Sequence, residues 1–327
     1  MFETLIDNLS HPPVLFFFLG MIGVLLKSNL EIPPQISKFL ALYLLFNIGL
    51  KGGEELFHSG FSPMMGKVLL TCIAVSFFVP FLVYRILRRR LDIKNAGAIA
   101  ATYGSISAVT FATAVSFLES IDVAFSGFMV AGMALMESPA IVSGLILIAL
   151  YSKKALKIKH SIDWKQILHE SFLNGSVYLL IGSLIIGILG GAEGEKELAP
   201  FIDDIFAGML SLYMLDMGLK AGERLSSFKA SGPFLIGFAL LYPLGGATLG
   251  IVLAFALGLS PGNALLMTTL IASASYIAVP AAMRISVPET NMSLLLPMSL
   301  GITFTFNVTL GIPLYYQAIL AFWEPAY

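Results

Sequence analysis

Long apolar stretches follow one another along the chain, and short segments between them hold most of the charged residues. A stretch of about 17–25 apolar residues is long enough to cross a bilayer as a helix. Several stretches contain Gly or Pro, which membrane helices tolerate. The pattern predicts an all-α integral membrane protein with ten transmembrane helices, over 13–30, 33–50, 66–87, 96–118, 124–150, 172–190, 200–219, 231–257, 262–283 and 292–322.

The composition supports a membrane protein and argues against a soluble two-domain enzyme, a disordered chain and a nucleic-acid-binding protein. Of 327 residues, 57% are hydrophobic and 12% are charged. Soluble domains carry about 25% charged residues, so this chain lacks the charge to cover a soluble globule. The net charge of −1 gives no field that attracts a polyanion. The single cysteine, Cys72, excludes an intramolecular disulfide and a Cys/His metal cluster.

The basic residues predict the orientation. Ten spans place sixteen of the 19 lysines and arginines in the loops that follow spans one, three, five, seven and nine. The other three are Lys51, Lys67 and Lys196. Cytoplasmic loops are rich in Lys and Arg, so both termini are expected on the non-cytoplasmic side. The basic runs over 85–94 and 153–165 are interpreted as topology signals; the alternative is a docking site for a cytoplasmic partner.

Two segments of the first half recur in the second half. NIGLKGGEEL at 47–56 matches DMGLKAGERL at 216–225, and the Ser-Ile-Ser at 105–107 matches the Ser-Ala-Ser at 273–275, at offsets of 169 and 168. Two matches in order at nearly one offset indicate an internal repeat. Five spans per copy turn the second copy upside down, as in many secondary transporters. We expect repeat units over 1–160 and 161–327.

The predicted spans 96–118 and 262–283 are both interrupted by small and polar residues. Irregular backbone at that depth is tolerated where it faces protein or a watery cavity. A helix that restarts there presents unpaired N–H groups, which bind anions. The alternative is that these small residues only pack helices together. The predicted anion site consists of Gly104, Ser105, Ile106, Ser107, Ser273, Ala274 and Ser275.

Glu137 is predicted to be the only ionisable side chain deep within a span. A carboxylate there is costly unless it is paired, protonated or bound to a cation. Asn307 is its approximate counterpart, at an offset of 170. Oxygen ligands suit Na⁺; a hydrogen-bonded carboxyl and a proton relay are the alternatives. Asn47 and Asp216 are expected near the ends of their helices, as interface anchors.

At these residues the chain resembles the SbtA-type sodium-dependent bicarbonate transporter family, as a divergent member. The resemblance covers nearly the whole chain. It is carried by Gly104-Ser105-Ile106-Ser107 with Thr110, by SASYIAVPAAMR at 273–284, by LGITFTFNVTLGIPLYY at 300–316 and by Met136-Glu137-Ser138-Pro139. Three positions, in two places, depart from the family pattern. Ala108-Val109 replaces a Gly-Ser pair, and Glu137 replaces an aspartate.

The resemblance implies a ten-span 5+5 inverted repeat with two broken helices that cross at the membrane midplane. Spans one, two, six and seven would form a gate, and spans three to five and eight to ten a core that moves past it like an elevator. It implies bicarbonate as the substrate, Na⁺ as the coupling ion without other cofactors, a homotrimer in a bacterial membrane and, as in some members of the family, a soluble PII-like regulator in the cytoplasm. The expected sodium ligands are Glu137, Ser107, Thr110, Ser275 and Asn307.

Three other functions are weighed against bicarbonate uptake. A Na⁺- or H⁺-coupled symporter of a short monocarboxylate is the first alternative, and only substrate competition separates it from bicarbonate uptake, because no residue distinguishes the tail of the substrate. A receptor or a purely structural membrane protein would not need broken helices. An intramembrane serine hydrolase is disfavoured because the histidines fall in loops or at the edges of spans, too far to act as a general base for the serines at 105, 107, 273 and 275. These histidines are His11, His58, His160 and His169.

Overall fold

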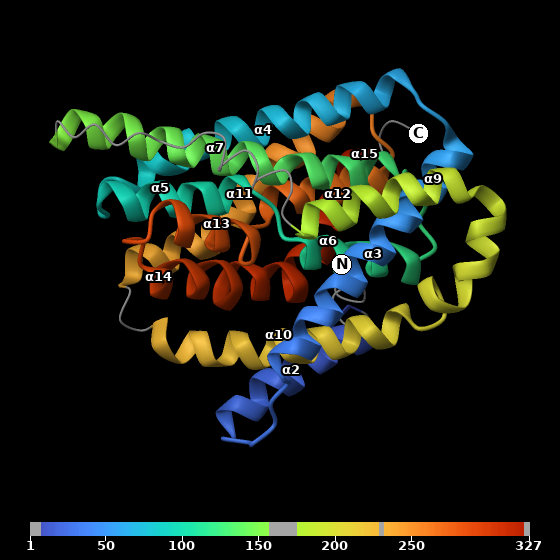
Figure 1. Cartoon of the computed structure of the whole chain (residues 1–327), viewed down its shortest axis with the longest axis horizontal. Coiled ribbons are helices and arrows are strands. Elements are labelled where there is room, and N and C mark those ends of the chain that lie inside the picture. Colours follow the sequence, from blue (N-terminus) through green and yellow to red (C-terminus); the bar gives the residue numbers. More distant parts are fainter. Residues whose placement is uncertain (1–7, 157–174, 229–231, 324–327) are drawn as a thin grey trace.

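The computed structural model describes residues 8–156, 175–228 and 232–323, and in these ranges it consists of helices joined by loops, with no strand in any of them (Figure 1). Prolines in the first turn begin several helices, because a residue there needs no N–H partner within the helix. The elements of the first half are α2 Pro12–Leu25, α3 Pro34–Ser59, α4 Pro63–Leu87, α5 Ile93–Gly104, α6 Ala108–Ser120 and α7 Phe128–Leu156.

The second half continues in the same manner. The helix α9 bends at Gly191, whose φ of +53° lies in the left-handed region that glycine tolerates. The last helical segment, Met292–Trp323, contains π-helical turns labelled η2 and η3. The elements are α9 Gly175–Ile202, α10 Phe206–Phe228, α11 Pro233–Leu257, α12 Pro261–Ala272, α13 Ala278–Ser286, α14 Met292–Leu296, η2 Pro297–Phe304, η3 Asn307–Gly311 and α15 Ile312–Trp323.

Six helical segments in the described ranges are long and apolar enough to cross a membrane. They are Pro63–Leu87, Ile93–Ser120, Phe128–Ser152, Gly175–Ile202, Pro233–Leu257 and Met292–Trp323. The other four predicted spans fall on α2 and α12–α13, which are short, and on α3 and α10, which carry charged residues along their length. The all-α membrane protein is confirmed, and the count of ten spans stays a prediction.

The two copies of the repeated motif lie inside long helices and pack against other helices. Gly49 and Gly53 of α3 lie against the backbone of α9, and Gly218 and Gly222 of α10 lie against α2. A methyl group at Gly218 would overlap the backbone of Phe17. The glycines of the motif therefore allow close approach of helix backbones, as small residues commonly do in membranes.

The expectation that Asn47 and Asp216 anchor helix ends is wrong. Both lie well inside their helices, α3 and α10, and are 0% and 2% exposed. Asn47 donates to the carbonyl oxygen of Ile202, and Asp216 pairs with Lys220 over 2.7 Å. Both helices are longer than the predicted spans, so residues placed at span ends by hydropathy fall in helix interiors. Polar partners, on the same helix for Lys220 and on α9 for Ile202, make their burial possible.

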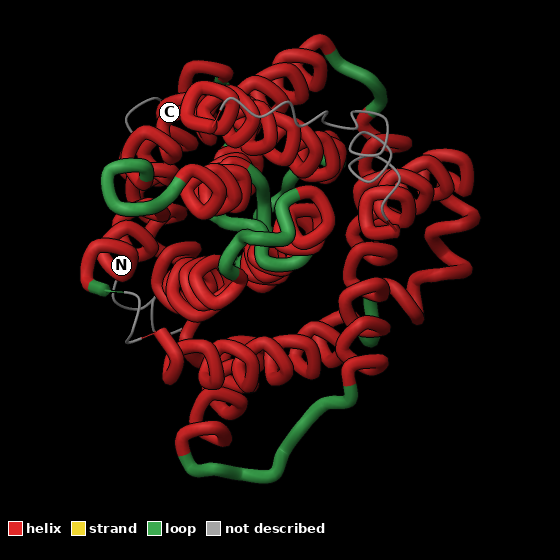
Figure 2. The backbone as a smooth tube through the Cα atoms, turned by 60° about the vertical axis from the view of Figure 1, so that its left-hand side comes forward, coloured by secondary structure: helices red, strands yellow, loops and turns green. Residues whose placement is uncertain are grey.

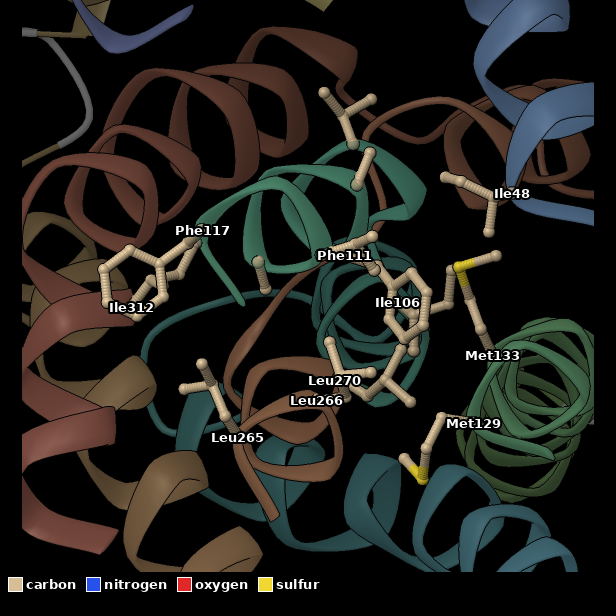
Figure 3. Packing of buried hydrophobic residues seen from close by; sticks show 14 of the residues in the cluster. Ile48, Ile106, Phe111, Phe117, Met129, Met133, Leu265, Leu266, Leu270 and Ile312 are labelled. Carbon is tan, nitrogen blue, oxygen red and sulfur yellow. The ribbon is translucent and has the colours of Figure 1, made fainter. Parts of the chain in front are cut away.

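The remaining helices surround the segments that are interrupted. The helices α4, α5 and α7 pack together, and α11 packs along α12. Figure 2 shows loop segments inside this bundle, enclosed by helices. Ile106 and Phe111 belong to one large hydrophobic core with Leu266 and Leu270 of α12 and Met133 of α7 (Figure 3). The interrupted segments are thus interior elements held by apolar packing.

Candidate functional site

Both predicted interruptions are present. The helix α5 ends at Gly104 and α6 begins at Ala108, while α12 ends at Ala272 and α13 begins at Ala278. Ser105 and Ser273, the first residues of each break, adopt extended backbone with ψ of −175° and 177°. Each interruption therefore ends one short helix and lets another begin.

Gly104 lies where the first break meets α4. A methyl group at this position would overlap the ring of Pro80 and come within 3.1 Å of the carbonyl oxygen of Ser76. Only glycine therefore allows α5 to end so close to α4. Ala274, in the other break, is buried as well. Neither residue offers a polar side-chain atom to an ion, so both shape the backbone of the site.

The two breaks are hydrogen-bonded to each other. The backbone N–H of Ser107 donates to the hydroxyl of Ser273 over 3.0 Å. The backbone N–H of Ser275 donates to the carbonyl oxygen of Thr102 over 2.9 Å. The Ser273 hydroxyl also donates to Leu270 of its own helix, over 2.9 Å. The two segments, more than 160 residues apart in sequence, therefore form one polar crossing.

Ser107 and Ser275 also satisfy backbone donors of the helices that follow. The Ser107 hydroxyl accepts from the N–H of Thr110 over 3.1 Å, and the Ser275 hydroxyl accepts from the N–H of Val279 over 3.2 Å. One of the unpaired N–H groups expected at each helix start is thus already capped. Each serine hydroxyl keeps its own proton as a donor. An anion at this place would meet hydroxyl donors as well as helix amides.

A small cavity of about 40 Å³ opens at the crossing. Ile106, Ser107, Ser275 and Glu137 are the predicted site residues that line it. A volume of roughly 10–15 Å³ on this measure holds one water, so the cavity accommodates a small ion or a few waters. Two serine hydroxyls, two helix starts and one carboxylate therefore surround the same space. The carboxylate comes from α7, which also carries Met133 into the cavity wall.

Glu137 is not the only acidic residue inside the fold, and its depth in the membrane stays a prediction. Asp216 is more completely buried, at 2% exposure, but it is paired with Lys220 and hydrogen-bonded by Ser37. The hydropathy pattern placed Asp216 at a span end because it missed the length of α10. Of these two acidic residues only Glu137 lines the cavity at the breaks.

The remaining predicted ligands lie around the crossing and do not line the cavity. The hydroxyls of Ser105 and Thr110 are buried and have no hydrogen-bond partner among the described residues. Each could accept a cation, since a hydroxyl oxygen has two lone pairs. Asn307 donates to the carbonyl oxygen of Ala272 over 3.0 Å and accepts from Tyr315 over 2.7 Å. Its amide therefore braces the end of α12.

Several cavity residues had no sequence signal. They are Leu45 of α3 and Ser176 and Leu180 of α9. Tyr276 lines the same space and lies within the run at 273–284 that carries the resemblance. The apolar residues from α3 and α9 resemble any other apolar positions in their helices, so only the packing of helices distant in sequence brings them to the site.

Other chemistries find no support in the described residues. No group of three His, Cys, Asp or Glu side chains is placed to hold a metal ion there. Cys72 is a buried free thiol in α4. His11 adjoins α2, and His58 lies 3.0 Å from Glu195 near the end of α3, so neither lines the serine cavity. His160 and His169 lie outside the described residues.

Comparison with known proteins identifies the family of the chain. A family model described as the Na⁺-dependent bicarbonate transporter superfamily matches residues 12–320, and this range includes both breaks, Glu137 and Asn307. No curated protein matches the chain. The match extends over nearly the whole sequence, and the matched family consists of transporters, so an enzyme is not expected. The chain belongs to the Na⁺-dependent bicarbonate transporter superfamily.

Proposed function

We propose that this protein is a secondary transporter that couples the entry of Na⁺ to the uptake of bicarbonate. The observation that carries the proposal is the convergence of two helix starts, two serine hydroxyls and the Glu137 carboxylate on one small cavity. The hydrogen-bond donors of the helix starts and the serine hydroxyls suit a small anion, and the Glu137 carboxylate suits a cation beside it. The family match supports both ions.

The electrostatics explain why the two ions would move together. A monovalent anion that enters a negative-inside cell works against about 2.3 kcal/mol per 100 mV, and one Na⁺ cancels that charge. Within the cavity, the positive charge of Na⁺ and the negative charge of the anion partly neutralise each other. Binding of Na⁺ and of the anion should therefore be mutually favourable, and thermodynamic linkage makes this coupling reciprocal.

The proposed anion site is built from the breaks at 104–107 and 273–275. For Na⁺ we propose Glu137 with the hydroxyls of Ser107, Thr110 and Ser275. The unpartnered, buried state of the Thr110 hydroxyl supports its place in this set. Asn307 contributes by fixing the Ala272 carbonyl at the end of α12, one residue before the break.

We also propose a ten-span 5+5 inverted repeat over 1–160 and 161–327. The gate would consist of α2, α3, α9 and α10, which pack in the pairs α3 with α9 and α2 with α10. The core would contain both crossing segments, and transport would move it past the gate like an elevator. Lys51 of α3 pairs with Glu119 of α6 over 2.8 Å, so an ion pair spans the proposed boundary. The homotrimer and a PII-like cytoplasmic regulator rest on family resemblance.

Uptake of labelled bicarbonate into proteoliposomes tests the function. An inward Na⁺ gradient should drive accumulation above equilibrium, and a K⁺ gradient of equal size should not. Short monocarboxylates in excess serve as competitors. Loss of the bicarbonate signal in their presence, with Na⁺-driven uptake of the competitor itself, would assign the site to a monocarboxylate. Accumulation driven by a pH gradient without Na⁺ would replace Na⁺ with H⁺.

The proposed location is the inner membrane of a bacterium, with both termini on the non-cytoplasmic side. Reporter fusions at Arg88 and at the two termini test this orientation. At Arg88, a reporter that is active only in the cytoplasm should give a signal. At the two termini, a reporter that is active only outside the cytoplasm should give a signal. A cytoplasmic C-terminus would contradict the ten-span count.

A further inference from the structure

A large apolar groove lies between α4 and α11, away from the ion cavity. Its volume is about 700 Å³. On α4 it is lined by Val79, Leu82, Val83 and Ile86, and on α11 by one face that runs from Pro233 to Leu249. At 1.5 Å per residue this face is about 24 Å long, most of the roughly 30 Å thickness of a bilayer's hydrocarbon core.

Two glycines keep the groove open. Gly237 and Gly245 both line it, and a Cβ added to either would meet no other side chain or distant backbone of the described chain within 4 Å. The rims are exposed apolar side chains, with Leu82 at 63% and Leu241 at 66% exposure. In a multi-pass membrane protein such surfaces lie against lipid, so acyl chains have direct access to the groove.

Positive charge lies beyond one end of the groove. On α4 the groove residues Val79, Leu82 and Ile86 follow one another at helical spacing and share one face. After Leu87 the chain continues in a hydrogen-bonded turn at Arg88, Arg89 and Arg90. Continued spacing of three to four residues places Arg89 and Arg90 at the groove end of this turn. Both are exposed. Exposed arginines next to an apolar groove suit a phosphate headgroup whose acyl chain enters that groove.

The floor of the groove contacts the last turns of the two helices that precede the breaks. Tyr242 lines the groove, and its hydroxyl donates to the carbonyl oxygen of Tyr103 and lies 3.3 Å from that of Ile271. Tyr103 stands one residue before the end of α5, and Ile271 one residue before the end of α12. Ile271 itself also lines the groove. A molecule in the groove therefore packs against residues that hold the ends of both interrupted helices.

We propose that this α4–α11 groove binds one acyl chain of an anionic phospholipid, whose headgroup lies against Arg89 and Arg90. Occupancy of the groove supports the position of Tyr242 and, through it, the geometry of the crossing. The lipid is thus a structural ligand that acts on the ion site through Tyr242, without contact with the transported ions.

Native mass spectrometry of the purified protein with added phosphatidylglycerol tests the binding. Gly245→Leu and Gly237→Leu add bulk to the groove at positions where an added Cβ meets no other atom within 4 Å, and they should reduce the bound lipid. Gly182→Leu is the matched control, because a Cβ at Gly182 also meets no other atom within 4 Å but projects from α9. Equal retention of phosphatidylglycerol by all three variants would overturn the proposal. A change in oligomer mass without loss of lipid would assign the groove to a second copy of the chain, and would overturn it too.

The headgroup contact has its own test. A basic residue near an anionic lipid surface contributes about 1 kcal/mol, or roughly fivefold in binding. Arg89→Gln with Arg90→Gln should therefore reduce the preference for phosphatidylglycerol over phosphatidylcholine by about 25-fold. Lys67→Gln, at the other end of α4, should leave it unchanged. An unchanged preference in the arginine variant would reject the anionic headgroup.

The effect on the crossing is measured separately. Thermal unfolding in detergent should show stabilisation by phosphatidylglycerol in the Gly182→Leu control and little in Gly245→Leu. Equal stabilisation of both would show that lipid in the groove does not support the crossing. These measurements need no transport activity, so they remain decisive even if the substrate proves not to be bicarbonate.

Discussion

The backbone N–H of Ser275 donates to the carbonyl oxygen of Thr102 over 2.9 Å, which ties the second break to the helix before the first. The bond from Ser107 to Ser273 runs between the same two segments. Neither break can shift alone without loss of a buried hydrogen bond. An ion that orders one break therefore orders the other, which gives the proposed coupling of Na⁺ and anion a direct physical path.

Ser273→Ala should lower the stability of the crossing. The substitution leaves the buried N–H of Ser107 without its acceptor, which costs about 1–3 kcal/mol. Thermal unfolding in detergent should begin at a lower temperature, and uptake should fall. Ser143→Ala is the matched control, since the Ser143 hydroxyl is equally buried but bonds only Ala140 of its own helix. Equal unfolding temperatures for the two variants would contradict the importance of this bond.

Ser107→Leu should abolish uptake while the protein still inserts and can be purified. The leucine would fill the cavity and remove the cap on the Thr110 amide. Ser275→Leu should have the same effect from the second break. Ser120→Leu, at the exposed end of α6, should transport normally. Normal uptake by either cavity variant in proteoliposomes would place the anion elsewhere.

Glu137→Gln should raise the Na⁺ concentration needed for half-maximal uptake. The change keeps the size of the side chain but removes its charge, and interactions with a charged group contribute about 1.5–3 kcal/mol, so the shift should be about tenfold or more. Glu31→Gln, in the exposed segment between α2 and α3, serves as the control. If Glu137→Gln only lowers stability and the Na⁺ dependence stays unchanged, the carboxyl is structural.

Gly218→Ala should destabilise the packing of α10 on α2. Its methyl group would overlap the Phe17 backbone, and overpacking of this kind costs about 1–3 kcal/mol. Gly208→Ala lies on the same helix, and its Cβ would meet no other atom within 4 Å. Thermal unfolding should therefore separate the two variants, with Gly208→Ala no less stable than the parent protein. Equal melting temperatures for Gly218→Ala and Gly208→Ala would show that α10 and α2 can move apart to accommodate the added methyl group without loss of stability.

Some features were predictable because their chemistry is local. The run Gly104-Ser105-Ile106-Ser107 breaks a helix through Gly104 and the capping serine Ser107, and its partner at 273–275 repeats the pattern of small and polar residues. Glu137 was identifiable because a carboxylate in an apolar stretch is costly. The repeated motif was also visible, although its glycines serve helix packing.

Other features depend on contacts that no local pattern encodes. Asn47 and Asp216 were misplaced because hydropathy marks apolar stretches, whereas α3 and α10 continue past them through charged residues. Their burial becomes tolerable only through partners such as Ile202 and Lys220. The π-helical turns at Pro297–Phe304 and Asn307–Gly311 likewise had no signal in the hydropathy pattern.

The fit of Gly104 against the ring of Pro80 has a consequence for relatives of this chain. The two positions share one small volume, so their substitutions cannot be independent. A homologue with any side chain at the first position should have lost the ring at the second, and an alignment of many sequences should show this pair changing together. An ancestral sequence with bulky residues at both positions should not have folded, so the two positions should not have been bulky at the same time.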